Sequence, residues 1–310
     1  MSRVLHTAQA LVDIVVSVPH LPERGQNVNA IGMPHPYAGG AVNILVAAAR
    51  TGAAAVHGGA HGTGPNGDLI RSTLQADGVE LAAPAIRNKD TGPCYVFVEP
   101  SGERSFVTTY GAERDITVNS LAQLRPQRDD LICVSGYSLF TPTRDPLLEW
   151  LETLPSDVAI VLDPGAPFAH FEEELRTRML SLTSVWTGNA QEASELTGLE
   201  NAPVADTLHA IRALLPRKDA VVIVRDGDKG CTLLVDGQVI DSPGFPQKAV
   251  DTNGAGDAHT GILLGERALG ADWATAARRA NAGAAIKVTR RGPASAPTRP
   301  EVDSFLAEHG

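Results

Sequence analysis

The sequence of 310 residues has no long apolar run, which argues against an integral membrane protein. No stretch approaches the about 20 consecutive apolar residues that a membrane-spanning helix needs. The N-terminal residues also lack the small-residue cleavage site of a signal peptide, and we expect them to form a first strand. The sequence therefore predicts a cytoplasmic protein with no membrane partner.

Cysteine is also scarce. The three cysteines, Cys94, Cys133 and Cys231, lie far apart and match no metal-binding spacing. An odd and sparse count favours reduced thiols in the cytoplasm over a disulfide framework. We expect all three to be small, buried apolar side chains.

Basic residues are outnumbered by acidic ones, 26 to 36, so the formal net charge is −10 at pH 7. Nucleic acid is therefore not expected as a partner, because binding to its phosphates relies on basic patches. A small phosphate ligand is compatible with this charge, since local backbone N–H groups and a metal ion can bind it.

Short β-branched runs alternate with amphipathic segments along most of the chain. The apolar runs occupy residues 54–62, 130–136, 158–165, 184–189 and 220–227, and the amphipathic segments include residues 66–78, 143–154 and 203–215. Continuous apolar runs suit parallel strands that are buried on both faces. The alternation predicts an α/β fold, a three-layer α/β/α sandwich with a mostly parallel central sheet, as one domain over residues 1–310.

Two segments depart from this alternation. Residues 12–37 contain several prolines and no helical pattern, and residues 93–110 are typical of a hairpin that turns around Pro100 to Glu103. A few strands without a core of their own need another surface to cover. We expect a small β lid, inserted from roughly residues 13–37 and 93–110, that covers a ligand site or forms a dimer contact.

The segment "DTNGAGD" (residues 251–257) has no core-building side chain between its two aspartates. An apolar helical pattern follows it, so Gly254, Ala255 and Gly256 are expected at a helix N-terminus, where free N–H groups bind anions. Asp257 follows in the first turn. A carboxylate beside an anion cradle suits a general base that takes a proton from an attacking hydroxyl. From this segment alone, a helix-capping role for Asp257 is the alternative.

This segment is similar to the second signature of the ribokinase-like (PfkB) carbohydrate kinases, D-T-x-G-A-G-D. Four further segments agree with the family in order and spacing: "YAGGAVNILVAAARTG" (37–52), "GNAQEASELTG" (188–198), "RDGDKG" (225–230) and "NAGAAIKVTRRGPASAP" (281–297). The resemblance as a whole extends over residues 8 to 305. The resemblance implies the ribokinase-like fold with its β lid, and a kinase that uses ATP and Mg²⁺.

The resemblance also implies which residues carry out catalysis and bind the sugar. Asp257 would be the catalytic base, and Gly254, Ala255 and Gly256 would form the anion hole for the transferred phosphoryl group. One such donor is typically worth about 10²–10³ in rate. The sugar would be bound by Asp13, Gly39, Gly40 and Asn43.

The nucleotide and the cations have their own implied residues. The nucleotide would be bound by Asn189, Glu192, Arg225, Gly227, Asp228, Gly230 and Asn281. Glu192, one helical turn after Asn189, would contact Mg²⁺ through water. The family commonly has threonine or serine in place of Arg225, so a contact there with the γ-phosphate stays open. A monovalent cation, K⁺, is the further candidate, with Asp251, Asn253, Lys287, Arg290, Gly292 and Ser295 as its ligands, mostly through backbone carbonyls.

The substrate prediction depends on residues 39–43. Ribokinases carry G-G-K-G-x-N there, whereas this chain has Ala41 and Val42 after the glycines. The missing lysine disfavours a phosphorylated substrate and argues mildly against ribose. The leading hypothesis is ATP-dependent phosphorylation of a primary hydroxyl on an unphosphorylated sugar or sugar-like molecule.

Alternatives to this hypothesis remain open. One is a nucleoside kinase, with pseudouridine among its substrates, and another is a non-catalytic nucleotide-sensing protein on the same fold. A dehydrogenase is disfavoured because no early G-x-G-x-x-G joins a strand to a helix, with "GGAHGTG" (58–64) as the nearest approach. A homodimer through the β lid is the expected oligomer if one forms.

Overall fold

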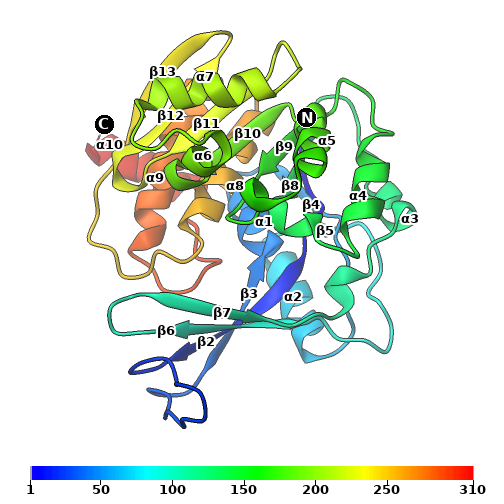
Figure 1. Ribbon diagram of the computed structural model, residues 1–310, viewed down its shortest axis with the longest axis vertical. Helices are drawn as coiled ribbons and strands as arrows, with labels where there is room; N and C mark the ends of the chain where they lie inside the picture. The colour runs from blue at the N-terminus through cyan, green and yellow to red at the C-terminus, as the bar shows by residue number, and fades with distance from the viewer. Residues whose placement is uncertain (1, 310) are drawn as a thin grey trace.

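A nine-stranded sheet runs through the centre of the molecule in the computed structural model, which describes residues 2–309 (Figure 1). Its strand order is β13-β12-β11-β10-β9-β8-β1-β4-β5. From one edge to the other these strands are β13 (Gln238–Pro243), β12 (Gly230–Val235), β11 (Val221–Arg225), β10 (Val185–Asn189), β9 (Ala159–Asp163), β8 (Leu131–Ser135), β1 (Arg3–His6), β4 (Ala54–His57) and β5 (Glu80–Leu81). The strands from β11 to β5 pair in parallel, and the β11–β12 and β12–β13 pairings are antiparallel. The predicted, mostly parallel central sheet is confirmed.

Helices cover both faces of this sheet, because alternate residues of each buried strand point to opposite faces. Val4 and Cys133 belong to one apolar cluster, while their neighbours Leu5 and Ile132 belong to the other. The first cluster includes α1 (Ala41–Arg50), α2 (Pro65–Ala76), α8 (Ala255–Ala268) and α9 (Trp273–Val288). The second includes α3 (Val118–Leu121), α4 (Arg144–Leu151), α5 (Glu173–Leu182), α6 (Ala190–Thr197) and α7 (Val204–Leu214). The α/β/α sandwich predicted from the sequence is therefore confirmed.

A further prediction concerns the cysteines. All three cysteines are free and buried, as expected. A final helix, α10 (Arg299–His309), packs on α9, and Phe305 contacts Phe245 edge to face. None of the helices within residues 2–309 is long and apolar enough to cross a membrane.

A separate four-stranded sheet lies beneath the main body (Figure 1). It consists of β3 (His35–Gly40), β2 (Ala10–Ser17), β6 (Pro93–Val98) and β7 (Arg104–Thr108), in that order. β6 and β7 form an antiparallel hairpin, and the Glu99 N–H donates to the Glu103 carbonyl at its turn. This hairpin lies where residues 93–110 predict one.

The expected first strand is two strands that belong to different sheets. The chain leaves the large sheet after His6 and enters the small sheet at Ala10. The bend between them is held by the Ala8 N–H, which donates to His6 Nδ1, and by the Gln9 carbonyl, which accepts from the Ala41 N–H. Asp13 therefore lies in the middle of β2, opposite Tyr37, rather than where the first strand of the sequence prediction ends.

The buried carboxylate of Glu266 connects three helices through ion pairs. Glu266, near the end of α8, is 1% exposed. Its Oε1 pairs with Arg279 Nε of α9 at 2.7 Å, and its Oε2 pairs with Arg299 Nη2 of α10 at 3.0 Å. A buried ion pair of this kind is costly to break, because the remaining partner is left charged in a site with little water.

Replacement of Glu266 by alanine should therefore destabilise the fold. We expect Glu266→Ala to lower the free energy of unfolding by about 3 kcal/mol, because Arg279 loses its buried partner. Urea denaturation measures this change. Asp303 is the matched control, since it pairs with the same arginine but is 55% exposed. Asp303→Ala should cost less than about 1 kcal/mol, and an equal loss in both variants would contradict the assignment.

Candidate active site

The N-terminus of α8 is built around a glycine turn. Gly254 has φ 75°, and a Cβ there would lie 2.7 Å from the Pro293 carbonyl oxygen, so only glycine fits. The Ala255 N–H donates to the Thr252 carbonyl at 3.2 Å, and the Asn253 N–H donates to Asp251 Oδ1. Within residues 2–309, the N–H groups of Gly254, Gly256 and Asp257 have no protein acceptor. The anion cradle thus differs from the predicted one, because the N–H of Ala255 closes the turn.

Asp257 lies in the first turn of α8, as predicted, and its side chain is partly buried. Its Oδ2 accepts a hydrogen bond of 2.8 Å from Nδ2 of Asn43, in the first turn of α1. Burial raises the pKa of Asp257 to about 6, with the hydrogen bond from Asn43 acting in the opposite direction. Such a carboxylate is ionised at neutral pH and has a proton affinity high enough for a general base.

The side chain of Asp13, in β2 of the small sheet, lies within electrostatic reach of Asp257. Burial, together with the negative charge of Asp257, raises the pKa of Asp13 to about 7. A Cβ on Gly39 would lie 2.3 Å from Asp13 Oδ2, so the carboxylate fits only beside glycine. Gly40 has φ 62° and begins α1, and a Cβ there would meet the Gln9 carbonyl at 2.5 Å. The structure brings Asp13, these glycines, Asn43 and Asp257 together.

Three polar residues end neighbouring parallel strands beside α8. Asp163, Asn189 and Arg225 are the last residues of β9, β10 and β11, and Asn189 pairs with Arg225 in the register. The carboxyl ends of parallel strands are where α/β sheets gather ligands. These three side chains therefore line the same edge of the sheet as the N-terminus of α8.

The guanidinium of Arg225 lies against the first turn of α8. Its Nη1 is 3.3 Å from Asp163 Oδ2 and 3.3 Å from the Gly256 carbonyl oxygen, and it also donates to the Thr260 hydroxyl. Its Nη2 is 3.8 Å from Glu192 Oε2. Arg225 thus joins two carboxylates to the helix that carries Asp257.

Sequence reasoning missed Asp163 and Thr260. Asp163 ends a predicted strand run, and strand ends of this kind are frequent ligand positions. Thr260 lies three residues after Asp257, on the same face of α8. Its hydroxyl donates to Asp163 Oδ2 at 3.0 Å. The position of Asp163 at the end of an apolar run was a sequence signal that could have identified it as a site residue.

Asn189 and Glu192 form a reciprocal cap at the start of α6. Asn189 Oδ1 accepts from the Glu192 N–H, and Glu192 Oε2 accepts from the Asn189 N–H, both at 2.8 Å. Burial raises the pKa of Glu192, and the charge of Asp163 adds to this. The pair caps the start of α6, while the Glu192 carboxylate still faces Arg225.

The turn between β11 and β12 contains the glycines of the predicted nucleotide loop. Gly227 and Gly230 have φ 57° and 103°, and a Cβ on Gly230 would meet the Ser242 carbonyl at 2.2 Å. Asp228 is exposed between them. Asn281 of α9 is buried, and its Nδ2 donates to the Ser242 carbonyl at 2.8 Å. Its Oδ1 lies 3.0 Å from His259 Nε2, so its amide is already engaged within the protein.

The residues expected to hold a monovalent cation lie beside the glycine turn at Gly254. The Asp251 carboxylate accepts from Arg104 Nη2 (3.2 Å), the Asn253 N–H (2.9 Å) and the Gly292 N–H (3.0 Å). The Asp251 carbonyl accepts from Lys287 Nζ at 2.9 Å. These oxygens already bind protein donors, so the residues present do not fit a potassium ion.

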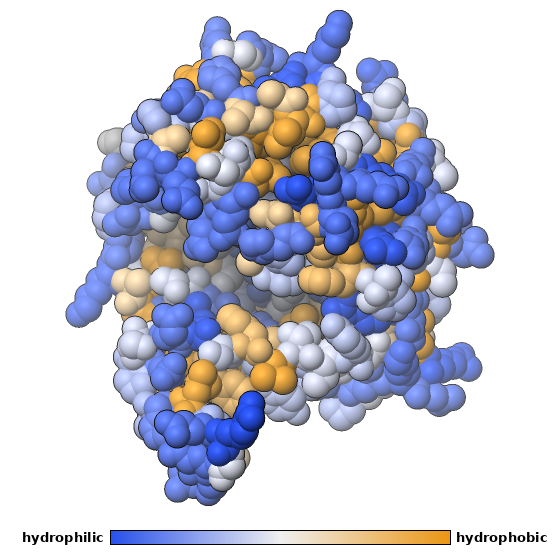
Figure 2. Space-filling view, viewed as in Figure 1, coloured by the Kyte–Doolittle hydropathy of each residue, from blue (hydrophilic) through white to orange (hydrophobic). Residues whose placement is uncertain are grey.

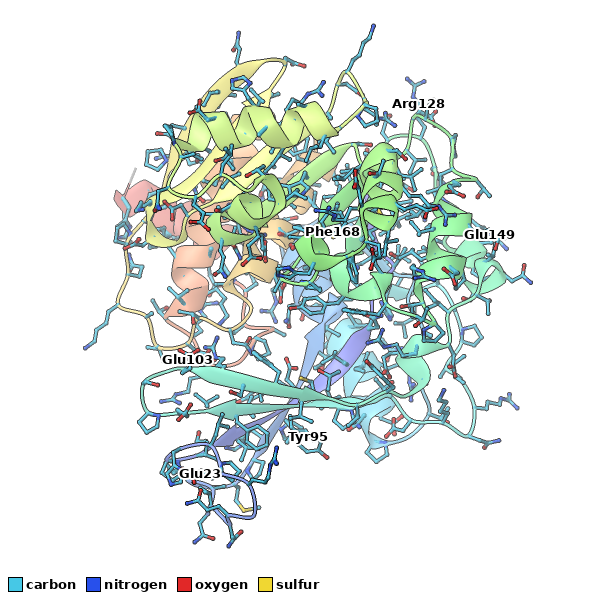
Figure 3. The ribbon with its side chains drawn as sticks, viewed as in Figure 1. Glu23, Tyr95, Glu103, Arg128, Glu149 and Phe168 are labelled. Carbon is cyan, nitrogen blue, oxygen red and sulfur yellow. The ribbon has the colours of Figure 1, made fainter. Side chains whose placement is uncertain are left out.

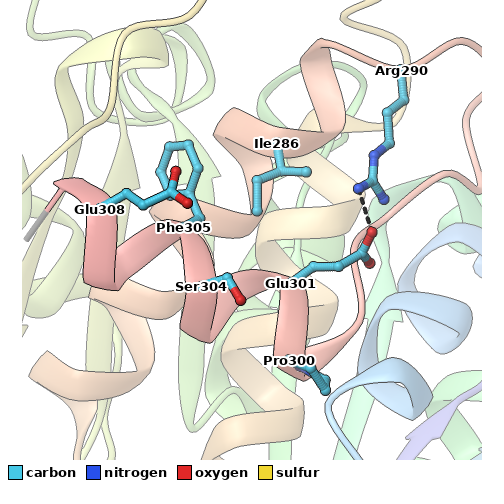
Figure 4. A pocket seen from close by; sticks show the side chains of 7 residues that line it. All are labelled: Ile286, Arg290, Pro300, Glu301, Ser304, Phe305 and Glu308. Atoms are coloured by element: carbon cyan, nitrogen blue, oxygen red, sulfur yellow. Dashed lines mark hydrogen bonds and ion pairs between the residues drawn. The ribbon is translucent and has the colours of Figure 1, made fainter.

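The other two candidate cation ligands are also engaged. Ser295 Oγ donates to the Gly292 carbonyl at 2.6 Å. The side chain of Arg290 turns toward α10 and pairs with Glu301 at 2.6 Å (Figure 4). This ion pair borders a shallow groove between α9 and α10 and neutralises the charge of Arg290.

A cleft of about 680 Å³ opens between the small sheet and the loops before α8 and after α9 (Figure 2). Its walls include Val15, Tyr37 and Val96 of the small sheet, with Asp251 and Asn253 opposite. Figure 3 shows Glu103 at the tip of the β6–β7 hairpin and Tyr95 on the underside of the small sheet, away from the main body.

Comparisons with known proteins agree with this architecture. The model of the pfkB family carbohydrate kinases matches residues 1–299. The chain is 31% identical over 299 residues to the uncharacterized sugar kinase YegV of Escherichia coli (strain K12), a match that covers 96% of this chain and 92% of that protein.

Solved structures show the same fold. The ribokinase of Thermotoga maritima superimposes with a TM-score of 0.81 at 25% identity, covering 99% of this chain and all of the other. The aminoimidazole riboside kinase of Salmonella enterica, complexed with aminoimidazole riboside and an ATP analog, has a TM-score of 0.78 at 24% identity. That match covers 98% of this chain and 100% of the other. The chain belongs to the PfkB family and is a carbohydrate kinase.

Proposed function

We propose that this kinase transfers the γ-phosphoryl group of ATP to a primary hydroxyl of an unphosphorylated sugar or sugar-like molecule, with Asp257 as the general base. The observation that carries the proposal is the position of the Asp257 carboxylate. It is partly buried, it is hydrogen-bonded to Asn43 on one side, and free N–H groups begin its helix. The likeness to a ribokinase and to a riboside kinase with an ATP analog supports the same chemistry.

In this mechanism the substrate lies between the two partly buried carboxylates of Asp13 and Asp257. Asp13 accepts hydrogen bonds from sugar hydroxyls, and Asn43 orients both the substrate and Asp257. Asp257 takes the proton from the attacking hydroxyl, a step that is typically worth about 10²–10⁴ in rate. The free N–H groups of Gly254 and Gly256 stabilise charge on the transferred phosphoryl group.

The nucleotide would lie along the carboxyl ends of β9, β10 and β11. Gly227 and Gly230 allow its phosphates to approach the backbone, and Arg225 supplies a positive charge beside Gly256. Glu192 and Asp163 would hold Mg²⁺ through water, and that ion would neutralise charge on the phosphates. Glu192 and Asp163 already share the guanidinium of Arg225, so the nucleotide and its metal would compete for established ion pairs.

The small sheet would act as the lid of one kinase domain that extends over residues 1–310. It carries Asp13 and forms one wall of the cleft. Its underside exposes Tyr95 and Val107, which are paired across the β6–β7 hairpin. This apolar pair supports a homodimer through the lid as the proposed oligomer.

A nucleoside kinase is the second candidate, because the cleft has an apolar wall. Val15, Ile31, Met33, Val96 and Val98 line it. Such a wall suits a planar base better than a hydroxyl-rich sugar.

A panel of substrates separates the two candidates. Ala41 and Val42 are buried and bring no cation to the sugar site. We therefore expect neutral sugars or nucleosides to raise the melting temperature and to be phosphorylated, and sugar phosphates to do neither. Thermal-shift and coupled ATP-consumption assays measure both. Stabilisation by fructose 6-phosphate alone would contradict the proposal, and preference for nucleosides over free sugars would select the second candidate.

The role of Asp257 is tested by Asp257→Asn. The amide keeps the hydrogen-bonding shape but accepts no proton, so turnover should fall by about 10²–10⁴. ATP binding, measured by calorimetry, should survive. If the variant kept full turnover, Asp257 would not be the base. If the wild-type protein bound ATP and phosphorylated nothing, the nucleotide-sensing alternative would hold.

The raised pKa values of Asp257 (about 6) and Asp13 (about 7) predict an acidic limb in the pH profile. Protonation disables Asp257 as a base and removes an acceptor at Asp13. We expect kcat/KM to fall below pH 7 and to drop about tenfold per pH unit well below pH 6. Asp13→Asn should leave a single limb near pH 6, because the carboxylate with the higher pKa is then absent. Rates that stay constant down to pH 5 would refute the assignment.

A further inference from the structure

Lys287 is a buried lysine whose ammonium lies inside the loop that leads into α8. Its side chain is 0% exposed. The Asp251 carbonyl oxygen, 2.9 Å from Nζ, is its only hydrogen-bond acceptor within residues 2–309. An ammonium removed from water is costly unless nearby negative charge or dipoles compensate it. A buried lysine at this position therefore needs an electrostatic reason.

The compensation comes from the loop itself. Burial lowers the pKa of Lys287, whereas the charges of Asp251 and Asp257 raise it. In return, the positive charge of Lys287 lowers the pKa of Asp257. Lys287 and the catalytic carboxylate are thus electrostatically coupled through residues 251–257.

Arg104 is a second cation on the same loop. It reaches across from β7 of the small sheet, and its Nη2 lies 3.2 Å from both Asp251 Oδ1 and Thr252 Oγ1. The Asp251 carboxylate also accepts from the N–H groups of Asn253 and Gly292. Within the described residues, the hydrogen bonds that the Asp251 oxygens accept all come from protein donors, two of which carry positive charge.

These contacts leave no role for an added ion. The family resemblance implies a monovalent cation beside this loop, yet the Asp251 oxygens, the Gly292 carbonyl and the Ser295 hydroxyl are occupied by one another and by these donors. Arg290 is not an alternative source of charge, because Glu301 neutralises it (Figure 4).

We propose that the Lys287 ammonium is the resident cation of the loop before α8, and that phosphoryl transfer by this protein needs no added monovalent cation. The inference rests on the proposed function. Lys287 is a positioning residue: it holds the Asp251 carbonyl, and Asp251 holds the Asn253 N–H at the start of the glycine turn. The orientation of the free N–H groups of Gly254 and Gly256 depends on this chain of hydrogen bonds.

Wild-type turnover should be indifferent to the cation. We expect rates in KCl, NaCl and tetramethylammonium chloride, at equal ionic strength, to agree within about twofold, since the charge is already supplied by the protein. Tetramethylammonium is too large to enter the loop. A tenfold or greater stimulation of the wild-type protein by K⁺ would overturn the proposal.

Two variants separate a cation role from mere packing. Lys287→Ala removes the charge and leaves space, so turnover should fall by about tenfold or more and recover in part in KCl or NH₄Cl. Lys287→Met removes the charge but fills the space, so it should lose turnover without recovery. Lys218→Met, at an exposed lysine between α7 and β11, is the matched control and should behave as wild type. Full turnover of Lys287→Ala in tetramethylammonium chloride would overturn the proposal.

The melting temperature gives a readout that does not depend on catalysis. Lys287→Ala should melt higher in KCl or NH₄Cl than in tetramethylammonium chloride, while Lys287→Met and wild type should show no such difference. This measurement stands even if no substrate is phosphorylated, a result that would count against the proposed function alone. If Lys287→Ala showed no cation-specific stabilisation, or if wild type did, the inference would be wrong.

Discussion

The partly buried carboxylate of Asp257 at the start of α8 is the constraint on which the rest of the site depends. An ionised carboxylate removed from water must be compensated by hydrogen bonds and by positive charge. Here the compensation comes from the Asn43 amide, the N-terminus of α8, Arg225 and Lys287. These groups belong to α1, α8, β11 and α9, so the carboxylate is compensated only when these elements have assembled.

The arrangement of charged side chains around Arg225 follows from the same constraint. Three carboxylates, those of Asp163, Glu192 and Asp257, act on a single guanidinium at the ends of adjacent strands. The acids raise the pKa of Arg225 despite its burial, and the arginine keeps them from becoming an uncompensated cluster. Arg225 thus places a permanent positive charge beside the first turn of α8.

The small sheet belongs to the site because the chain passes directly from one sheet to the other. The bend after His6 carries the backbone from the centre of the large sheet into β2, where Asp13 faces Asp257. Arg104 closes a second link from β7 to Asp251. The small sheet and the loop before α8 are therefore directly connected, since a movement of the small sheet would change the contact between Arg104 and Asp251.

The local chemistry of the sequence determined the large sheet, its helices, the β6–β7 hairpin and the helix N-terminus at Gly254. Continuous apolar runs form strands that are buried on both faces, and a left-handed backbone turn needs glycine. Neither property depends on the rest of the chain. The motif resemblance also brought Asp13, Asn43 and Asp257 into one expected site, and these side chains lie together in the structure. The position of Asp13 within the second strand was not predictable, because strand periodicity does not tell which sheet a strand joins.

Only the tertiary structure decided which charges compensate one another. Thr260 and Asp163 are 97 residues apart, and Arg104 and Asp251 are 147 apart, so no sequence spacing relates them. The same holds for the Lys287 ammonium, whose partner is a backbone carbonyl that every residue possesses. The residue types were visible in the sequence, but the electrostatic energy of each pair depends on separation and burial, and these exist only once the layers have packed.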